Sequence, residues 1–122
     1  MLRVLMVEDQ EVDAELAVRA LRRSGLQLEC ERVDSERAFR AALTRGPDLV
    51  LSDGQVPGFD GLAALAIVRA EAPQIPFIVL SGAPWDHRAQ AAIEAGAADF
   101  VCKADLSALA PAIARALGGR RN

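Results

Sequence analysis

The 122-residue sequence is short of several residue types that define whole classes of protein. It has no tyrosine, one tryptophan and one histidine, and no apolar run approaches the about 20 residues of a membrane-spanning helix. Its two cysteines, Cys30 and Cys102, lack the CxxC spacing of a metal or redox site, so we expect reduced core residues. The first apolar run stops at two acids, unlike a signal peptide. These absences predict a cytoplasmic protein without a membrane segment.

Charge excludes a further class of partner. The formal net charge is -3, and the basic residues are scattered apart from the arginine pairs at 22–23 and 120–121. A nucleic-acid-binding surface normally gathers its basic residues, so we expect no direct nucleic-acid partner. The composition, 52% hydrophobic and 25% charged, fits one folded domain. We expect a single domain over residues 1–122, with 118–122 as a frayed tail.

Short apolar runs alternate with segments of helical period along the whole chain. Runs such as "DLVLS" and "PFIVLS" are apolar throughout, as parallel strands covered on both faces must be. The alternation predicts an α/β fold with a doubly wound, five-stranded parallel sheet of order 2-1-3-4-5, which is flavodoxin-like. The predicted strands lie near residues 3–7, 28–33, 48–52, 76–80 and 98–102.

The intervening segments carry helix signals of unequal strength. Val12, Leu16 and Ala20 recur every four residues after the first strand. Ser35 is a natural N-cap for the second helix. The fourth helix, around residues 86–95, has few large apolar residues. We therefore expect it to be the least firmly packed of the helices.

Polar residues follow four of the predicted strands, and parallel strands bring these ends to one edge. The first strand is followed by Glu8 and Asp9, and the others by Asp53, Ser81 and Lys103. Three crowded carboxylates repel one another, and an all-oxygen site with room for water suits Mg²⁺ or Mn²⁺. Asp53 can then act as a nucleophile that forms an aspartyl phosphate, with Lys103 neutralising charge.

Each of these residues also has an ordinary structural explanation. Glu8 and Asp9 are acids at the start of a helix, where negative charge is favoured. Asp53 precedes Gly54 and Ser81 precedes Gly82, as turn residues often do. Unrelated structural reasons rarely place five such groups on one edge, so the joint pattern favours a functional site.

Four motifs stand in this order at the predicted strand ends. They are "ED" at 8–9, "LSDGQVPGFDG" at 51–61, "VLSGA" at 79–83 and "GAADFVCK" at 96–103. Each is weak alone, but together they resemble the receiver domain of two-component response regulators over nearly the whole chain. The resemblance implies that Asp53 takes a phosphoryl group from a histidine kinase or a phosphotransfer protein.

The resemblance also implies roles for the other site residues. It implies that Mg²⁺ is held by Glu8, Asp9, Asp53 and the backbone carbonyl of Gln55. It implies further that Ser81 and Lys103 contact the phosphoryl group, and that Ser81 and Phe100 form a switch. Gln55 and Ala83, which flank the acceptor, are expected to set the rate at which water hydrolyses the aspartyl phosphate.

Several positions depart from the family's usual pattern or have two interpretations. The family usually follows its lysine with a proline in a cis peptide, whereas Ala104 follows here. Phe100 has no hydroxyl, and an aromatic residue in this strand can equally be a core residue. His87 and Trp85 are candidate partner contacts, or a solvated histidine and a tryptophan packed on its loop.

Three other functions use similar residues at strand ends. A phosphatase with a strand-end aspartate nucleophile carries a second aspartate two residues on, where this chain has Gln55. An FMN-binding flavodoxin needs a hydroxyl- and glycine-rich loop where this chain has "EDQEVDAE". A degenerate receiver that works without phosphate remains open because of Ala104. We expect a signalling protein that is not an enzyme, whose output is by protein contact or phosphate relay and whose assemblies can include a homodimer.

Overall fold

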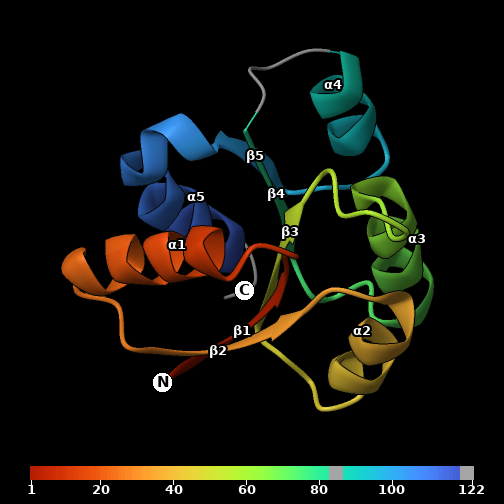
Figure 1. Cartoon of the computed structure of the whole chain (residues 1–122), viewed down its shortest axis with the longest axis horizontal. Coiled ribbons are helices and arrows are strands. Elements are labelled where there is room, and N and C mark those ends of the chain that lie inside the picture. The colour runs from red at the N-terminus through yellow and green to blue at the C-terminus, as the bar shows by residue number, and fades with distance from the viewer. Residues whose placement is uncertain (83–86, 119–122) are drawn as a thin grey trace.

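The computed structural model describes residues 1–82 and 87–118 and contains one parallel sheet (Figure 1). The order of its strands is β2-β1-β3-β4-β5, and every neighbouring pair is parallel. This confirms the predicted architecture and strand order. The strands are β1 (Leu2–Val7), β2 (Leu28–Val33), β3 (Leu49–Asp53), β4 (Phe77–Ser81) and β5 (Asp99–Cys102).

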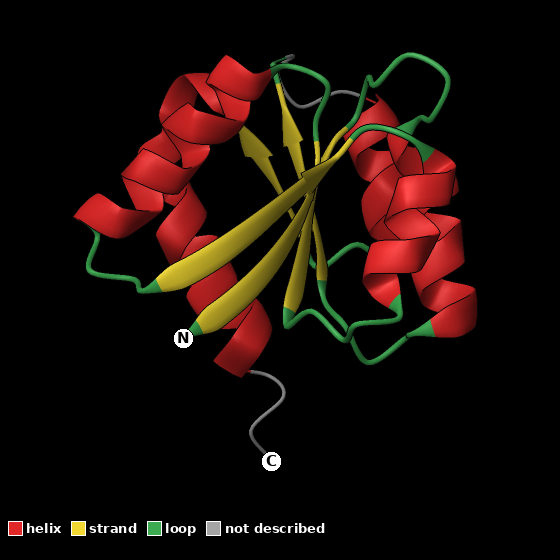
Figure 2. Cartoon of the chain, turned by 60° about the horizontal axis from the view of Figure 1, so that its bottom comes forward, coloured by secondary structure: helices red, strands yellow, loops and turns green. Residues whose placement is uncertain are grey.

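Helices cover both faces of the sheet, as the apolar strands require (Figure 2). On one face, α1 (Glu11–Arg23) and α5 (Leu109–Gly118) bury residues against one core cluster. On the other, α2 (Glu36–Leu43), α3 (Gly61–Glu71) and α4 (His87–Glu94) pack against a second cluster. A 3-10 helix, η1 (Lys103–Ala108), leads from β5 into α5.

Alternate residues of each strand feed the two clusters. In β1, Val4 and Met6 join the α1 and α5 side, while Leu5 and Val7 join the other side. Burial of these side chains on both faces supplies most of the driving force for folding. It also fixes the register of the strands, because a slip by one residue would exchange the two faces. The strand ends that form the site are therefore held firmly in place.

Local signals account for where two of the helices begin. The Ser35 hydroxyl accepts a hydrogen bond from the Ala38 N–H at 3.2 Å, as predicted for an N-cap. Asp60 does the same for α3, accepting from the Ala63 N–H at 2.8 Å. In α4, the buried residues are only Ala89 and Ala92, which agrees with its expected loose packing.

Two details of the sequence interpretation are corrected by the structure. The predicted first helix is present, but Val12 is 65% exposed, and the buried face of α1 is Ala14, Ala17 and Leu21. Small residues at 14 and 17 let the helix approach the sheet closely, so the larger Val12 and Leu16 are left outward. Cys30 and Cys102 are free thiols, but they are half-buried and not core residues.

Candidate functional site

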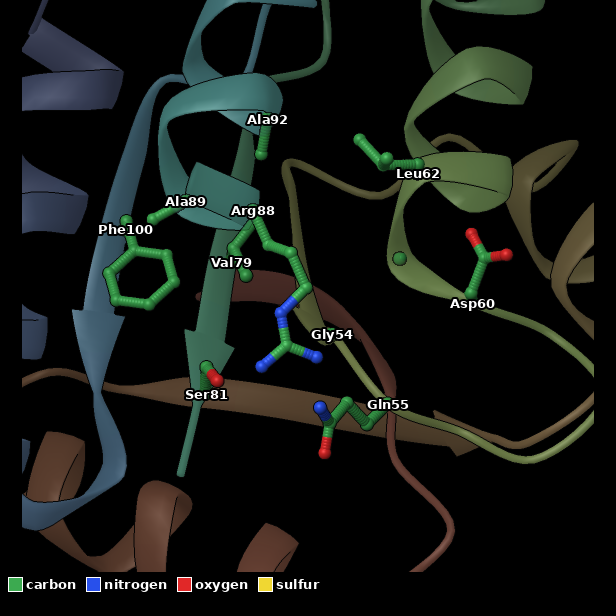
Figure 3. A pocket seen from close by; sticks show the side chains of 11 residues that line it. Gly54, Gln55, Asp60, Leu62, Val79, Ser81, Arg88, Ala89, Ala92 and Phe100 are labelled. Atoms are coloured by element: carbon green, nitrogen blue, oxygen red, sulfur yellow. The ribbon is translucent and has the colours of Figure 1, made fainter. Parts of the chain in front are cut away.

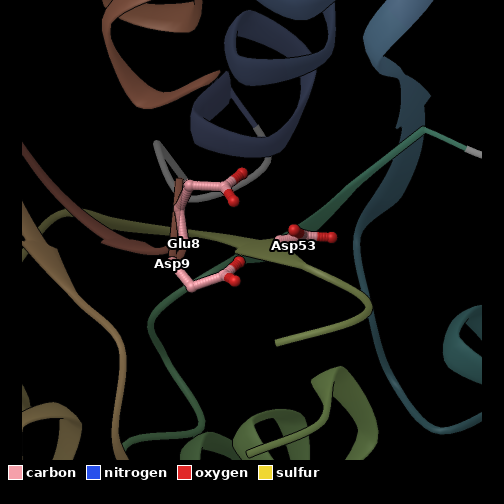
Figure 4. Close-up of side chains that lie close together, drawn as sticks. All are labelled: Glu8, Asp9 and Asp53. Atoms are coloured by element: carbon pink, nitrogen blue, oxygen red, sulfur yellow. The ribbon is translucent and has the colours of Figure 1, made fainter. Parts of the chain in front are cut away.

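The carboxyl ends of β1 and β3 bring three acids together. The two strands are neighbours with Val7 opposite Ser52, so the next residues of each strand meet at the edge. Carboxylate oxygens of Glu8, Asp9 and Asp53 all lie within 4.8 Å of one another. Figure 4 shows the three carboxyl groups gathered at this edge. A group of oxygen ligands this close is suited to a hard divalent cation.

Lys103 enters the same cluster from the end of β5. Its Nζ lies 2.6 Å from Glu8 Oε1, 2.8 Å from Asp13 Oδ2 and 3.3 Å from Asp53 Oδ2. An ammonium has three N–H donors, so these three carboxylates can occupy all of them. Lys103 is also the only lysine in a chain that otherwise uses arginine. A compact ammonium, unlike the planar guanidinium, can fill the centre of three carboxylates.

Burial and charge act in opposite directions on the two central groups. Glu8 is 1% exposed, and burial raises its pKa above the ordinary value of 4.5, against the opposing effect of Lys103. Burial alone would lower the pKa of Lys103, but its hydrogen bonds to Asp13 and Glu8 raise it above 10.5. The lysine therefore stays charged at neutral pH, and a buried Glu8 carboxylate depends on it.

Of the remaining predicted residues, the structure describes Gln55, Ser81 and His87. The Gln55 N–H donates to Asp53 Oδ1 at 3.1 Å, which orients the carboxylate. Ser81 is the last residue of β4 and is buried. His87 is the first residue of α4 and is exposed. Ala83 and Trp85 lie outside the described residues.

A cavity of about 440 Å³ lies next to Gly54 and Gln55, which follow Asp53, between the sheet and helices α3 and α4. Ser81 and Gln55 line it near the strand ends, and Phe100 lines it from β5 (Figure 3). Phe100 is half-buried and packs against the core cluster of that face. The ring of Phe100 therefore contacts the core and also adjoins free space. This position is compatible with both sequence interpretations, a core residue and a switch residue.

Two charged residues of the site were missed by the sequence interpretation. Asp13 lies four residues after Asp9, one turn into α1, and this spacing was its only signal. Arg88 lines the cavity, and in Figure 3 its side chain extends from α4 toward the side where Ser81 and Gln55 lie. The peptide that precedes Ala104 is trans, as are all the peptides within the described ranges.

The site and the fold together match one family model. Residues 4–114 match the response regulator receiver domain. The chain therefore belongs to the response regulator receiver domain family, whose members serve two-component signal transduction. The predicted family is confirmed, and the match covers four strands in full and β1 from Val4 onward.

Curated relatives carry receiver-like segments within longer proteins. The chain is 36% identical over 111 residues to a protein-glutamate methylesterase/protein-glutamine glutaminase of Anaeromyxobacter dehalogenans, covering 90% of this chain and 31% of that protein. It is 34% identical over 119 residues to the transcriptional regulatory protein PrrA of Mycobacterium tuberculosis, covering 98% of this chain and 51% of PrrA. The chain thus spans about half or less of these relatives.

Solved structures agree with the fold. The receiver domain of a signal transduction histidine kinase from Syntrophus aciditrophicus has a TM-score of 0.80 and 30% identity, covering 100% of this chain and 94% of that chain. A receiver domain protein from Clostridium thermocellum has a TM-score of 0.86 at 21% identity, with 99% and 98% covered, and supports the fold alone. Among the described residues, no helix is both long enough and apolar enough to cross a membrane.

Proposed function

We propose that this chain is a phosphoacceptor signalling switch in which Asp53 receives a phosphoryl group from a histidine kinase or a phosphotransfer protein. One observation carries the proposal: Asp53 belongs to the three-carboxylate cluster and also lies 3.3 Å from the Lys103 ammonium. An acceptor needs both features, a cation site and a fixed positive charge beside the nucleophile.

The donor set fits Mg²⁺, with Mn²⁺ as a second candidate. Glu8, Asp9 and Asp53 would supply carboxylate oxygens and Gln55 its backbone carbonyl. When bound, the cation supplies charge neutralisation and a template for the phosphoryl oxygens. Glu8 is nearly fully buried with only Lys103 and a backbone N–H to balance it, and a nearby cation would lower the energy of its charged form.

The transfer itself needs little covalent chemistry from the protein. An Asp53 carboxylate oxygen forms a bond to phosphorus while the bond between phosphorus and the donor's histidine nitrogen breaks, and that nitrogen keeps the electron pair. Lys103 and the Ser81 hydroxyl would contact the phosphoryl oxygens. The acyl phosphate so formed would be hydrolysed slowly by water, at a rate set by Gln55 and Ala83, and no external substrate is turned over.

The response to phosphate would arise on the opposite side of Asp53. Ser81 would move toward the phosphoryl group, and Phe100 would turn into the cavity of about 440 Å³ that it lines. The surface formed by α4, β5 and α5 would then change its shape for a partner, by a shift between two existing states. We assign this role to a single cytoplasmic domain spanning 1–122, whose output is protein contact, with homodimerisation as one form.

The test is incubation with a small phosphodonor and Mg²⁺, followed by intact mass measurement. We expect a labile adduct on the wild type, none on Asp53→Asn, and an undiminished adduct on Asp34→Asn. Asp34 is a matched control because it follows β2 at the same edge and is exposed. Equal labelling of Asp53→Asn, or a requirement for zinc in place of magnesium, would overturn the assignment.

A second measurement tests the proposed switch against the alternative of a degenerate receiver that works without phosphate. Fluoroberyllate mimics an acyl phosphate, and its binding should change the amide NMR signals of α4 and β5 in the wild type. Phe100→Ala should bind it and lose most of that change. If the wild-type α4 signals stay unmoved while Asp53 still takes phosphate, the chain is a passive phosphate carrier.

A further inference from the structure

Asp13 holds Lys103 more closely than the acceptor does. The distance from Lys103 Nζ to Asp13 Oδ2 is 2.8 Å, against 3.3 Å to Asp53 Oδ2. Asp13 reaches this position from α1, on the helical turn that follows Asp9. Its side chain is 37% exposed, so its carboxylate loses less hydration than that of the buried Glu8.

Asp13 also differs from the other acids in what it can bind. The carboxylates close enough to share a cation within the described part of the chain are those of Glu8, Asp9 and Asp53. Asp13 lies outside that set, and its carboxylate accepts a hydrogen bond from the Lys103 ammonium. A bound cation and a phosphoryl group would both draw oxygens of Glu8 and Asp53 away from the lysine, whereas Asp13 would keep its contact.

The side chain of Lys103, the first residue of η1, needs contacts to fix its position. Long lysine side chains have many rotamers, and fixing one requires a partner. The partners seen for the ammonium are the three carboxylates.

We propose that Asp13 is a positioning residue that keeps the Lys103 ammonium aimed at the acceptor once Glu8 and Asp53 are engaged by the cation and the phosphoryl group. This inference rests on the proposed phosphoacceptor function. Asp13 touches neither the phosphoryl group nor the cation and acts through Lys103 alone. Without Asp13, the remaining partners of Lys103 would be Glu8 and Asp53, which would already be engaged by the cation and the phosphoryl group.

The first test compares phosphorylation rates at saturating Mg²⁺, which removes any effect on cation affinity. Asp13→Asn is expected to lower the rate from a small phosphodonor about five- to tenfold, the effect of losing one charge-assisted, partly exposed hydrogen bond. Asp13→Glu, which keeps the charge, should retain most of the rate. Glu15→Gln removes a carboxylate from the exposed part of the same helix and should match the wild type.

The same measurement in a Lys103→Met background separates positioning from a general structural role. If Asp13 acts through the lysine, adding Asp13→Asn to Lys103→Met should change the residual rate by less than about twofold. A further loss as large as in the wild type would overturn the proposal. A faster reaction in the single Asp13→Asn variant would also overturn it, because Asp13 would then hold the lysine away from the acceptor.

A spectroscopic measurement reports the contact directly, without any reaction. Because Lys103 is the only lysine, protein labelled with [15N]lysine gives one side-chain ammonium signal. In the metal-free protein and with Mg²⁺ and fluoroberyllate, Asp13→Asn should speed the exchange of its protons with water, whereas Glu15→Gln should not. Unchanged exchange in both states contradicts the proposal.

The two hypotheses fail in different ways. If the wild type takes no phosphate at Asp53, the proposed function is wrong, whatever Asp13 does. If the wild type is labelled and Asp13→Asn equals it in rate and in ammonium exchange, only the positioning role is wrong.

Discussion

The two sides of Asp53 are built on opposite principles. On the acidic side, which comprises Glu8, Asp9, Asp13 and Lys103, charged groups are paired at distances of 2.6 to 2.8 Å around a buried glutamate. On the cavity side, which comprises Ser81, Phe100 and α4, the structure has about 440 Å³ of unfilled volume and a helix whose buried residues are alanines. Ion pairs hold the side chains of the acidic side in place, whereas the free volume of the cavity side allows side chains to move.

The difference would suit the two tasks of the proposed phosphorylation switch. Chemistry at an acceptor requires fixed charges that need no reorganisation during transfer. A change of surface requires free volume and weak packing, since close-packed interiors resist small displacements. Asp53 lies at the boundary, so one added group can be held on the acidic side and sensed on the cavity side.

The largest expected effect comes from breaking the acidic side at its single cation. Lys103→Met leaves Glu8 buried without its ion pair, and we expect a loss of about 3 kcal/mol in the free energy of unfolding at pH 8. Urea denaturation of the metal-free protein measures it. A matched control is Arg115→Met, which removes the exposed partner of Asp99 and should change stability by less than about 1 kcal/mol.

The pH dependence gives this prediction its sign. Burial raises the pKa of Glu8 above 4.5, so the folded state binds more protons than the unfolded state above that pH. Its effect on stability therefore becomes unfavourable as pH rises through the window above 4.5. Without Lys103 the pKa rises further, so the variant should lose more stability than the wild type between pH 5 and pH 8. An equal loss at both pH values would point to packing in place of charge.

The raised pKa of Lys103 also makes stability fall with rising pH, but only at much higher pH. Its stabilising effect is fully present below the ordinary value of 10.5 and is lost only as pH rises above it, because the unfolded chain releases that proton first. The charge of Lys103 itself should therefore stay constant from pH 5 to pH 8. The pH dependence expected for the stability of Lys103→Met over that range arises from the titration of Glu8.

The next prediction compares an alanine-to-leucine substitution at a closely packed position with the same substitution at a position that lines the cavity. Ala64 is fully buried in α3, and Ala64→Leu should overpack the core and lose about 1 to 3 kcal/mol. Ala89 is as buried but lines the cavity, so Ala89→Leu should change the free energy of unfolding by less than about 1 kcal/mol. Denaturant midpoints of the two variants measure the difference.

Ala89→Leu should also affect signalling if the cavity is the space into which Phe100 turns. Phosphorylation of Asp53 should proceed at the wild-type rate, while the fluoroberyllate-induced NMR changes in β5 should shrink. A loss of stability equal to that of Ala64→Leu would mean that the cavity is not available to a side chain, and the contrast between the two sides would fail.

The sequence was sufficient for the features that depend on strand order. Apolar runs separated by helical segments predicted the parallel sheet, and parallel strands place their carboxyl ends together. Glu8, Asp9, Asp53 and Lys103 could therefore be grouped without coordinates. Their functional roles remain proposals, but their proximity is observed.

Features that depend on side-chain direction or on volume were not predictable in this way. Glu11, Asp13 and Glu15 are all acids early in α1, and only the rotation of the helix decides that Asp13 faces Lys103. The same rotation leaves Val12 exposed, although its spacing suggested a buried face. The few large apolar residues of α4 predicted loose packing, but they did not predict the position or the size of the cavity that this helix lines.

The smallest expected effect tests whether all the residues that line the cavity are loosely packed. Gly61 also lines the cavity, yet a Cβ built on it would lie 3.1 Å from the Gly54 Cα, so α3 and the segment after Asp53 touch backbone to backbone. Gly61→Ala should lose about 1 kcal/mol and slow the phosphorylation of Asp53, because Gly54 must shift. At Gly82 a Cβ would meet no atom of the described residues within 4 Å, and Gly82→Ala should gain about 0.5 kcal/mol by restricting the unfolded chain. If both variants are neutral in denaturation and in phosphorylation, the segment after the acceptor is as free as the rest of the cavity wall. The fixed side would then end at Asp53 and would not extend to Gly54.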